Sequence, residues 1–271
     1  VTLSPLPLAR EGPGERADIC PVARRHGIRY IETMPTYLSI PIDECHDPLV
    51  AIPREAFVFT EPHPYAVLGA PYGAATPWLL RRRVLDALHR AQAELAARRP
   101  GWRLKLFDAW RPLEVQAFMV WREFQLQAQR SGHDLAGLNA PHELQAQAPD
   151  VYDILAARVF EFWGIPSADP ARPPPHSTGA AIDLTLVDAS GFEAAMGSPI
   201  DETTERSYPH HYANAIDASE REFHANRELL NAAMAAAGFH RHVNEWWHFS
   251  LGDQMWARAC GAAAAIYGRA A

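Results

Sequence analysis

The stretch "PPPHSTGAAIDLTLV", Pro173–Val187, holds the clearest strand pattern in the chain. Three prolines give it a rigid, extended start, because each proline fixes φ and disfavours helix for the residue before it. Gly179 permits a turn after His176, and a strand with alternating side chains follows. The hydrophobic face of this strand consists of Ile182, Leu184 and Leu186. Asp183 therefore points away from that face, and a buried carboxylate is costly unless it is paired or binds a metal.

The segments on either side of this strand predict an α+β fold. Helices are expected over residues 77–100, 112–131, 151–163 and 219–238, a strand over 103–110 and a strand or strand pair over 239–251, with short strand candidates between residues 28 and 59. Thr76 and Ser219 are the expected N-caps of the first and last helices. Because strands outnumber simple crossover units, the order favours a small central antiparallel sheet with flanking helices over a doubly wound sheet.

The bulk composition is that of an ordinary globular protein, with 48% hydrophobic and 21% charged residues. The net charge is −7, and the one basic cluster is Arg81–Arg83, which argues against nucleic acid or an anionic membrane surface as a partner. Residues 1–25 are expected to form an extended arm, and residues 26–271 a single domain with a longer helical and Pro-rich segment at about 131–175. The arm and this segment are candidates for covering a cleft or for a homo-oligomer contact.

The three cysteines, Cys20, Cys45 and Cys260, are widely spaced and include no C-x-x-C pair. This pattern supports neither a disulfide framework nor a thiolate zinc site, and it favours a reducing, cytoplasmic compartment. No apolar run reaches the length of a transmembrane helix. The N-terminal sequence does not have the pattern of a signal peptide, although a start at Val1 leaves open a removed leader and a periplasmic location.

A second polar motif occurs in "NEWWHFSLGDQ", Asn244–Gln254. Its aromatic content predicts a strand, and in an ideal strand Glu245 and His248 would point to opposite faces. If both belong to one site, the chain must bend between them, or Glu245 must lie in the turn before the strand. The alternative is a tryptophan-rich core strand with tolerated polar residues.

The two motifs together suggest a metal site. Two neutral imidazoles and one carboxylate are the ligands of an open catalytic zinc site, and His176, Asp183 and His248 supply that set. Glu245 is then available as a general base that is not a ligand. Taken separately, the first motif is equally well explained by a capping aspartate and a hydrogen-bonded structural histidine, and the second by the tryptophan-rich core strand.

A third motif, "DAWRPLEVQ", places Arg111 at a predicted strand–helix junction. A guanidinium keeps its charge and could stabilise a developing oxyanion. The alternative is a surface ion pair of Arg111 with Asp108 or Glu114.

In this order and spacing, "DAWRP", "HSTGAAIDLTL", "MGSPIDE" and "NEWWHFSL" resemble the D-alanyl-D-alanine dipeptidases, the VanX-type zinc peptidases related to bacterial D,D-carboxypeptidases and the hedgehog fold. The resemblance covers roughly Phe107 to Gly252. It implies a hedgehog/D,D-peptidase-like fold and one Zn²⁺ held by the two histidines and the aspartate above. It also implies Glu245 as general base, Arg111 as oxyanion stabiliser and Asp201 as the contact of the substrate ammonium. Trp246 and Trp247 are expected to wall the site, with Trp247 assigned to substrate binding.

The sequence departs from the family at two positions. Related enzymes have a substrate-binding serine two residues before the first zinc histidine, where this chain has Pro174. A tyrosine that shapes the family's pocket aligns with Met34, and Tyr30 or Tyr37 could replace it.

The expected activity is hydrolysis of the small dipeptide D-Ala-D-Ala in peptidoglycan metabolism. Alternatives are a related D,D- or L,D-peptidase acting on longer peptidoglycan peptides, a non-catalytic zinc-binding protein of the same fold, and a metal-free protein that uses these residues structurally.

Overall fold

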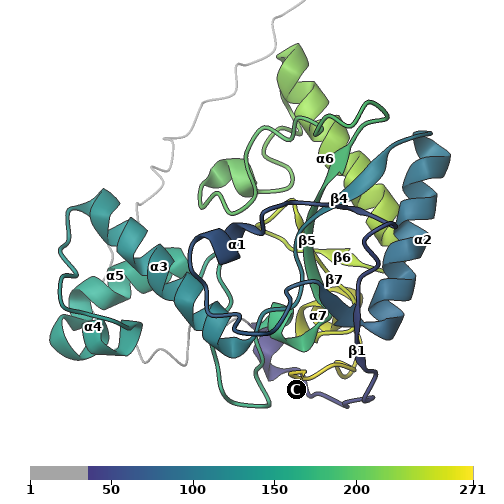
Figure 1. Ribbon diagram of the computed structural model, residues 1–271. Coiled ribbons are helices and arrows are strands. Elements are labelled where there is room, and N and C mark those ends of the chain that lie inside the picture. The colour runs from purple at the N-terminus through teal and green to yellow at the C-terminus, as the bar shows by residue number, and fades with distance from the viewer. Residues whose placement is uncertain (1–35, 271) are drawn as a thin grey trace, which may run out of the picture. The chain divides into compact units, whose positions relative to one another are not determined.

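Two long amphipathic helices, α2 (Arg82–Arg98) and α6 (Ala218–Ala236), cover one face of a five-stranded sheet (Figure 1). The computed structural model describes residues 36–270. The expected arm at residues 1–25, together with Tyr30 and Met34, lies outside this range. The described residues fall within one compact unit.

The sheet has the strand order β2-β4-β5-β7-β6. Its strands are β2 (Val58–Phe59), β4 (Arg103–Asp108), β5 (Ala181–Val187), β7 (His248–Ser250) and β6 (His240–Arg241). All neighbours are antiparallel except β2 and β4, so the sheet is mixed rather than wholly antiparallel as expected. A separate antiparallel pair joins β1 (Leu49–Ala51) to β3 (Leu79–Arg81). The α+β class is confirmed.

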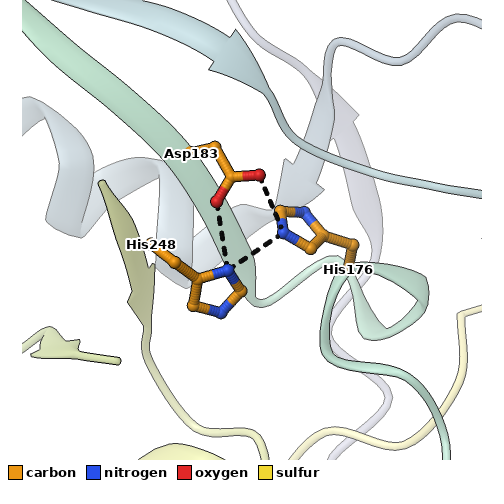
Figure 2. A group of neighbouring side chains, drawn as sticks. All are labelled: His176, Asp183 and His248. Carbon is orange, nitrogen blue, oxygen red and sulfur yellow. Dashed lines mark hydrogen bonds and ion pairs between the residues drawn. The ribbon is translucent and has the colours of Figure 1, made fainter. Parts of the chain in front are cut away.

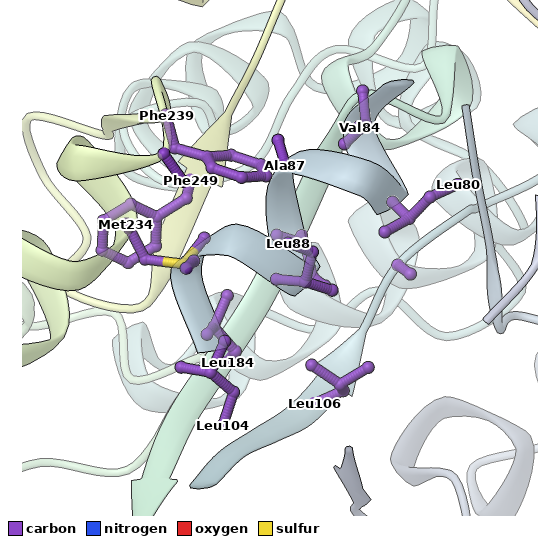
Figure 3. Packing of buried hydrophobic residues seen from close by; sticks show 14 of the residues in the cluster. Leu80, Val84, Ala87, Leu88, Leu104, Leu106, Leu184, Met234, Phe239 and Phe249 are labelled. Carbon is purple, nitrogen blue, oxygen red and sulfur yellow. The ribbon is translucent and has the colours of Figure 1, made fainter. Parts of the chain in front are cut away.

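The core lies between the sheet and the two long helices (Figure 3). Leu106 pairs with Leu184, and Leu104 pairs with Leu186, so the two central strands present one continuous leucine surface. The α2 residues against it are Val84, Leu88, Ala91 and Leu95, all fully buried. The hydrophobic residues that alternate along the strands therefore pack against those that repeat every 3.6 residues along α2, as the sequence predicts.

Several predicted element boundaries were wrong. The helix expected from residue 77 begins at Arg82, because Leu79–Arg81 instead pairs with β1 and the Arg81 amide donates to the Gly179 carbonyl. Helix α6 begins at Ala218, since the Asp217 carboxylate, rather than Ser219, accepts the first free amides. The helix expected to reach residue 163 ends at Val159.

Three helices pack together at the side of the sheet opposite α2 (Figure 1). They are α3 (Leu113–Ser131), α4 (Pro141–Gln147) and α5 (Pro149–Val159). Helix α3 ends at left-handed Gly132 as predicted, whereas α4 was not anticipated. Much of the segment at residues 131–175 is therefore helical. The remaining short elements are η2 (Thr36–Ser39), α1 (Pro64–Val67), η3 (Pro175–Thr178), η4 (Glu205–Ser207) and α7 (Gln254–Cys260).

Cys45 and Cys260 are exposed and unpaired, whereas Cys20 lies outside the described residues. None of the helices between residues 36 and 270 is long and apolar enough to cross a membrane.

Candidate active site

The three central strands present a row of polar residues on the sheet face opposite the core. Asp108 pairs with Asp183, and Asp183 pairs with His248, so one residue from each strand faces the same side. The ladder between β4 and β5 shifts between Leu106 and Asp108, so Phe107 is an extra residue in β4. Without this bulge Asp108 would lie on the leucine face, so the bulge turns a buried carboxylate toward the site.

His176, Asp183 and His248 form a group that could hold a metal ion, with potential ligand atoms within 4.8 Å of one another. His176 Nε2 lies 3.1 Å from His248 Nδ1 and 3.2 Å from Asp183 Oδ2, and His248 Nδ1 lies 3.0 Å from Asp183 Oδ1 (Figure 2). Tetrahedral zinc bonded at about 2.0–2.1 Å needs ligand atoms about 3.3 Å apart. The group therefore fits a zinc ion with shifts of a few tenths of an ångström.

Hydrogen bonds orient both imidazoles for this role. His176 Nδ1 donates to the Ala109 carbonyl over 2.6 Å, which leaves the Nε2 lone pair facing the group. Ser250 Oγ donates to Asp253, so it can accept from His248 Nε2 at 3.3 Å and leave the Nδ1 lone pair inward. Two nitrogen lone pairs and a carboxylate that converge in a buried space are stabilised by a cation.

The charge states agree with a ligand set. Burial alone would raise the pKa of Asp183, but attraction and hydrogen bonding from His176 and then His248 hold that pKa well below its usual range. Burial lowers the pKa of His248, which favours the neutral imidazole that metals bind.

Glu245 lies beside this group in the connection between β6 and β7. Strand β7 begins at His248, so Glu245 is outside the regular strand, as the spacing predicted. Its Oε2 is 3.7 Å from His248 Nδ1. Burial, followed by the nearby charges of Asp183 and Asp201, raises the pKa of Glu245 well above its usual range. A carboxylate with a raised proton affinity next to a ligand group can accept a proton from water.

Arg111 is buried within the site rather than paired at the surface, and it donates four hydrogen bonds. Its Nε donates to Asp108 over 2.5 Å, and Nη1 donates to Gln116 over 3.0 Å. Nη2 donates both to Asp183 over 2.9 Å and to the Tyr65 hydroxyl over 3.0 Å. The guanidinium is therefore held beside Asp183 of the candidate metal-ligand group, and it lines the same cavity.

Asp201 and Trp247 line the same cavity as the ligand group, a space of about 30 Å³. Asp201 adopts a left-handed backbone conformation, with φ of 65°, which is strained for a residue with a side chain. Trp246 packs at a right angle to Trp247 in the core and donates to Ser198. Of this neighbouring pair, Trp247 lines the cavity and Trp246 does not.

Sequence reasoning missed two nearby residues. His242, to which no role in the site was assigned, lines the cavity, and burial lowers its pKa to about 3, so it is neutral. Tyr65 lies in residues 60–68, for which no element or role was predicted, yet it contacts Arg111 and Asp201. Pro174 offers no donor in place of the family serine, and its carbonyl accepts from Ser177. Tyr37 lines a neighbouring cavity of about 430 Å³.

The chain is similar in sequence to known proteins. The D-Ala-D-Ala dipeptidase family, peptidase M15, matches residues 59–264. A D-alanyl-D-alanine dipeptidase of Synechocystis is 42% identical over 82% of this chain and 88% of its own length. One of Escherichia coli is 32% identical over 64% of this chain and 66% of its own. A solved structure of the LdcB LD-carboxypeptidase covers 80% of this chain and 72% of its own, with 15% identity and a TM-score of 0.38. The family match spans most of the chain, including all four sequence motifs, and the chain therefore belongs to the peptidase M15 family of D-Ala-D-Ala dipeptidases.

Proposed function

We propose that this peptidase hydrolyses the dipeptide D-Ala-D-Ala with one zinc ion, as part of peptidoglycan metabolism. The observation that carries the proposal is the convergence of a buried His-Asp-His group with a separate buried carboxylate 3.7 Å away. A structural metal site needs no such extra carboxylate, whereas hydrolysis needs a base. The names of the relatives supply the substrate.

In this proposal His176, Asp183 and His248 hold the zinc. When bound, the ion would supply Lewis-acid polarisation of the scissile carbonyl and acidify the attacking water. His248 and Asp183 need little proton release to receive it, because burial lowers the pKa of His248 and the pKa of Asp183 is held well below its usual range.

Glu245 acts as general base and then as general acid. It takes a proton from the attacking water and returns that proton to the amine of the leaving D-alanine. Its position outside the strand keeps its carboxylate on the same side as His248, so the proton travels a short distance. The Arg111 guanidinium stabilises the negative charge that develops on the carbonyl oxygen.

Asp201 binds the free ammonium of the substrate. A carboxylate in a small, half-buried pocket favours a charged amine and leaves an acylated nitrogen unpaired. This contact favours a dipeptide over the alternative of longer peptidoglycan peptides, whose corresponding nitrogen is acylated.

The test uses purified, zinc-loaded protein with three substrates: D-Ala-D-Ala, N-acetyl-D-Ala-D-Ala and a muropeptide ending in D-Ala-D-Ala. We expect kcat/KM for the free dipeptide to exceed that for the two acylated substrates by a wide margin. Glu245→Gln should keep its zinc, measured by elemental analysis, and lose at least about 100-fold in kcat. Preference for the muropeptide would contradict the dipeptidase proposal, and unchanged kcat in Glu245→Gln would contradict the assigned base.

A further inference from the structure

Tyr65 connects two parts of the site that have different proposed roles. It lies on the short helix α1, and its side chain is almost fully buried. Arg111 Nη2 lies 3.0 Å from its hydroxyl, and the same hydroxyl lies 3.1 Å from Asp201 Oδ1. Tyr65 does not line the cavity, so it reaches the substrate only through these two partners.

The direction of this hydrogen-bond chain is fixed by chemistry. A guanidinium can only donate, so the hydroxyl accepts from Arg111. The single phenol proton is then free to be donated to Asp201. Burial raises the pKa of Tyr65 well above its usual range, so the hydroxyl keeps that proton.

Other contacts keep the phenol in place. The Arg111 guanidinium lies over the Tyr65 ring, 4.9 Å from its centroid. His63 caps helix α1 by accepting from the Ala66 amide through Nδ1, and its Nε2 donates to Asp108 over 3.0 Å. Because Asp108 also binds Arg111, the helix and the guanidinium share one buried carboxylate as their anchor.

The hydrogen bond from Tyr65 makes the two carboxylate oxygens of Asp201 different. Oδ1 accepts from Tyr65, whereas Oδ2 has no hydrogen bond to any residue in the range 36–270. The ion pairs of Arg111 go to Asp108 and Asp183, so its hydrogen-bonded connection to Asp201 runs through the phenol.

We propose that Tyr65 is a positioning residue that sets the preference for a free amino terminus by holding Asp201 Oδ1, so that Oδ2 faces the substrate ammonium. The proposal rests on the proposed function for the identity of the substrate. The phenol also separates the positive Arg111 from the negative Asp201, so each can serve its own part of the substrate. Without the hydroxyl, Asp201 loses its orientation, and the guanidinium competes with the substrate ammonium for it.

The test compares D-Ala-D-Ala with N-acetyl-D-Ala-D-Ala for wild type, Tyr65→Phe, Asp201→Asn and the double variant. Tyr65→Phe should raise KM for the free dipeptide by about tenfold to a hundredfold, the usual effect of losing a hydrogen bond to a charged group, with a smaller change in kcat. Activity on the acetylated dipeptide should change little. The double variant should be no worse than Asp201→Asn alone, because Tyr65 acts through Asp201.

Tyr72→Phe is the matched control. It removes a buried phenol hydroxyl that contacts Asp108 over 3.3 Å rather than Asp201, so the preference for a free amine should persist. Tyr65→Leu is a second variant that lacks the hydroxyl and should show the same loss of preference. Circular dichroism and zinc content verify that each variant is folded and loaded.

Three outcomes would overturn the role of Tyr65. They are a wild-type preference in Tyr65→Phe, an equal fall in kcat for both dipeptides, or losses that multiply in the double variant. If the wild type does not hydrolyse D-Ala-D-Ala, the proposed function fails, and calorimetric binding of the two dipeptides still tests Tyr65. Equal loss of preference in Tyr72→Phe would show a general network effect and would also contradict the proposal.

Discussion

Two carboxylates in the site differ in environment and therefore in the pH range over which they are charged. Attraction from the two histidines outweighs burial at Asp183 and keeps its pKa low, whereas burial and then the Asp183 charge raise the pKa of Asp201 to about 7. Asp183 thus remains a ligand over a wide pH range. Asp201 can lose its charge near neutrality unless a cation pairs with it.

This difference predicts a pH-dependent benefit of Asp201. The ratio of kcat/KM between wild type and Asp201→Asn should be largest above the Asp201 pKa of about 7 and should fall toward one at lower pH, because the protonated carboxyl no longer pairs with an ammonium. Steady-state assays of both proteins from pH 5 to 9 measure this, and protonation of the shared base Glu245 cancels in the ratio. A pH-independent ratio would exclude an ionic role for Asp201.

At the residue scale, the sequence predicted the groups whose spacing carries chemistry and missed those that depend on long-range packing. His176, Asp183 and His248 lie on a strong strand pattern and a tryptophan-rich motif, and the structure brings them together. Tyr65 lies on a helix of only four residues, where no periodicity can be read, and its partner Asp201 is 136 residues away. Contacts of that kind are set by the tertiary fold rather than by local pattern.

At the element scale, the turn between His176 and β5 requires glycine. Gly179 has φ of +72°, and a Cβ there would lie 2.3 Å from Leu49 Cδ2 on strand β1. The same glycine carbonyl accepts from the Arg81 amide on β3, so the turn packs against the small second sheet. That pairing also explains why the first helix starts later than predicted: strand partners cannot be seen in a local helix signal.

Gly179→Ala should therefore destabilise the fold by about 2–4 kcal/mol, through left-handed strain and the clash with Leu49. Gly191→Ala is the matched control, since Gly191 has φ of +85° with nothing within 4 Å of a built Cβ. Gly191→Ala should lower the free energy of unfolding only by the backbone strain, about 1–2 kcal/mol. Urea unfolding of the two variants separates the backbone strain from the clash with Leu49. Equal losses of stability would show that the close approach to β1 is unimportant.

At the scale of the whole molecule, the proposed zinc ligands come from η3, β5 and β7, so the complete set exists only in the folded sheet. A ligand that binds only the folded state adds to its stability by mass action. The site and the hydrophobic core lie on opposite faces of the same strands, so metal binding and folding are expected to be linked.

Zinc at 100 times its Kd should stabilise the protein by about 2.7 kcal/mol and raise Tm by roughly 5–10 °C for a chain of this size. Chelation should reverse the shift. Scanning calorimetry of wild type and His248→Ala measures the shift in Tm, and zinc should raise the Tm of the variant much less. A wild-type Tm that is independent of zinc would mean that the group does not bind the ion in solution.

The connection between β6 and β7 keeps several residues of the site together. It carries Glu245 and Trp247 and leads directly into His248, so the proposed base, a cavity-lining side chain and a proposed metal ligand belong to one short covalent segment. Phe162, Trp163 and Gly164, which also line the cavity, belong instead to the segment that follows helix α5. A substitution in that segment should therefore change the binding of substrate and leave the spacing of Glu245 and His248 unchanged.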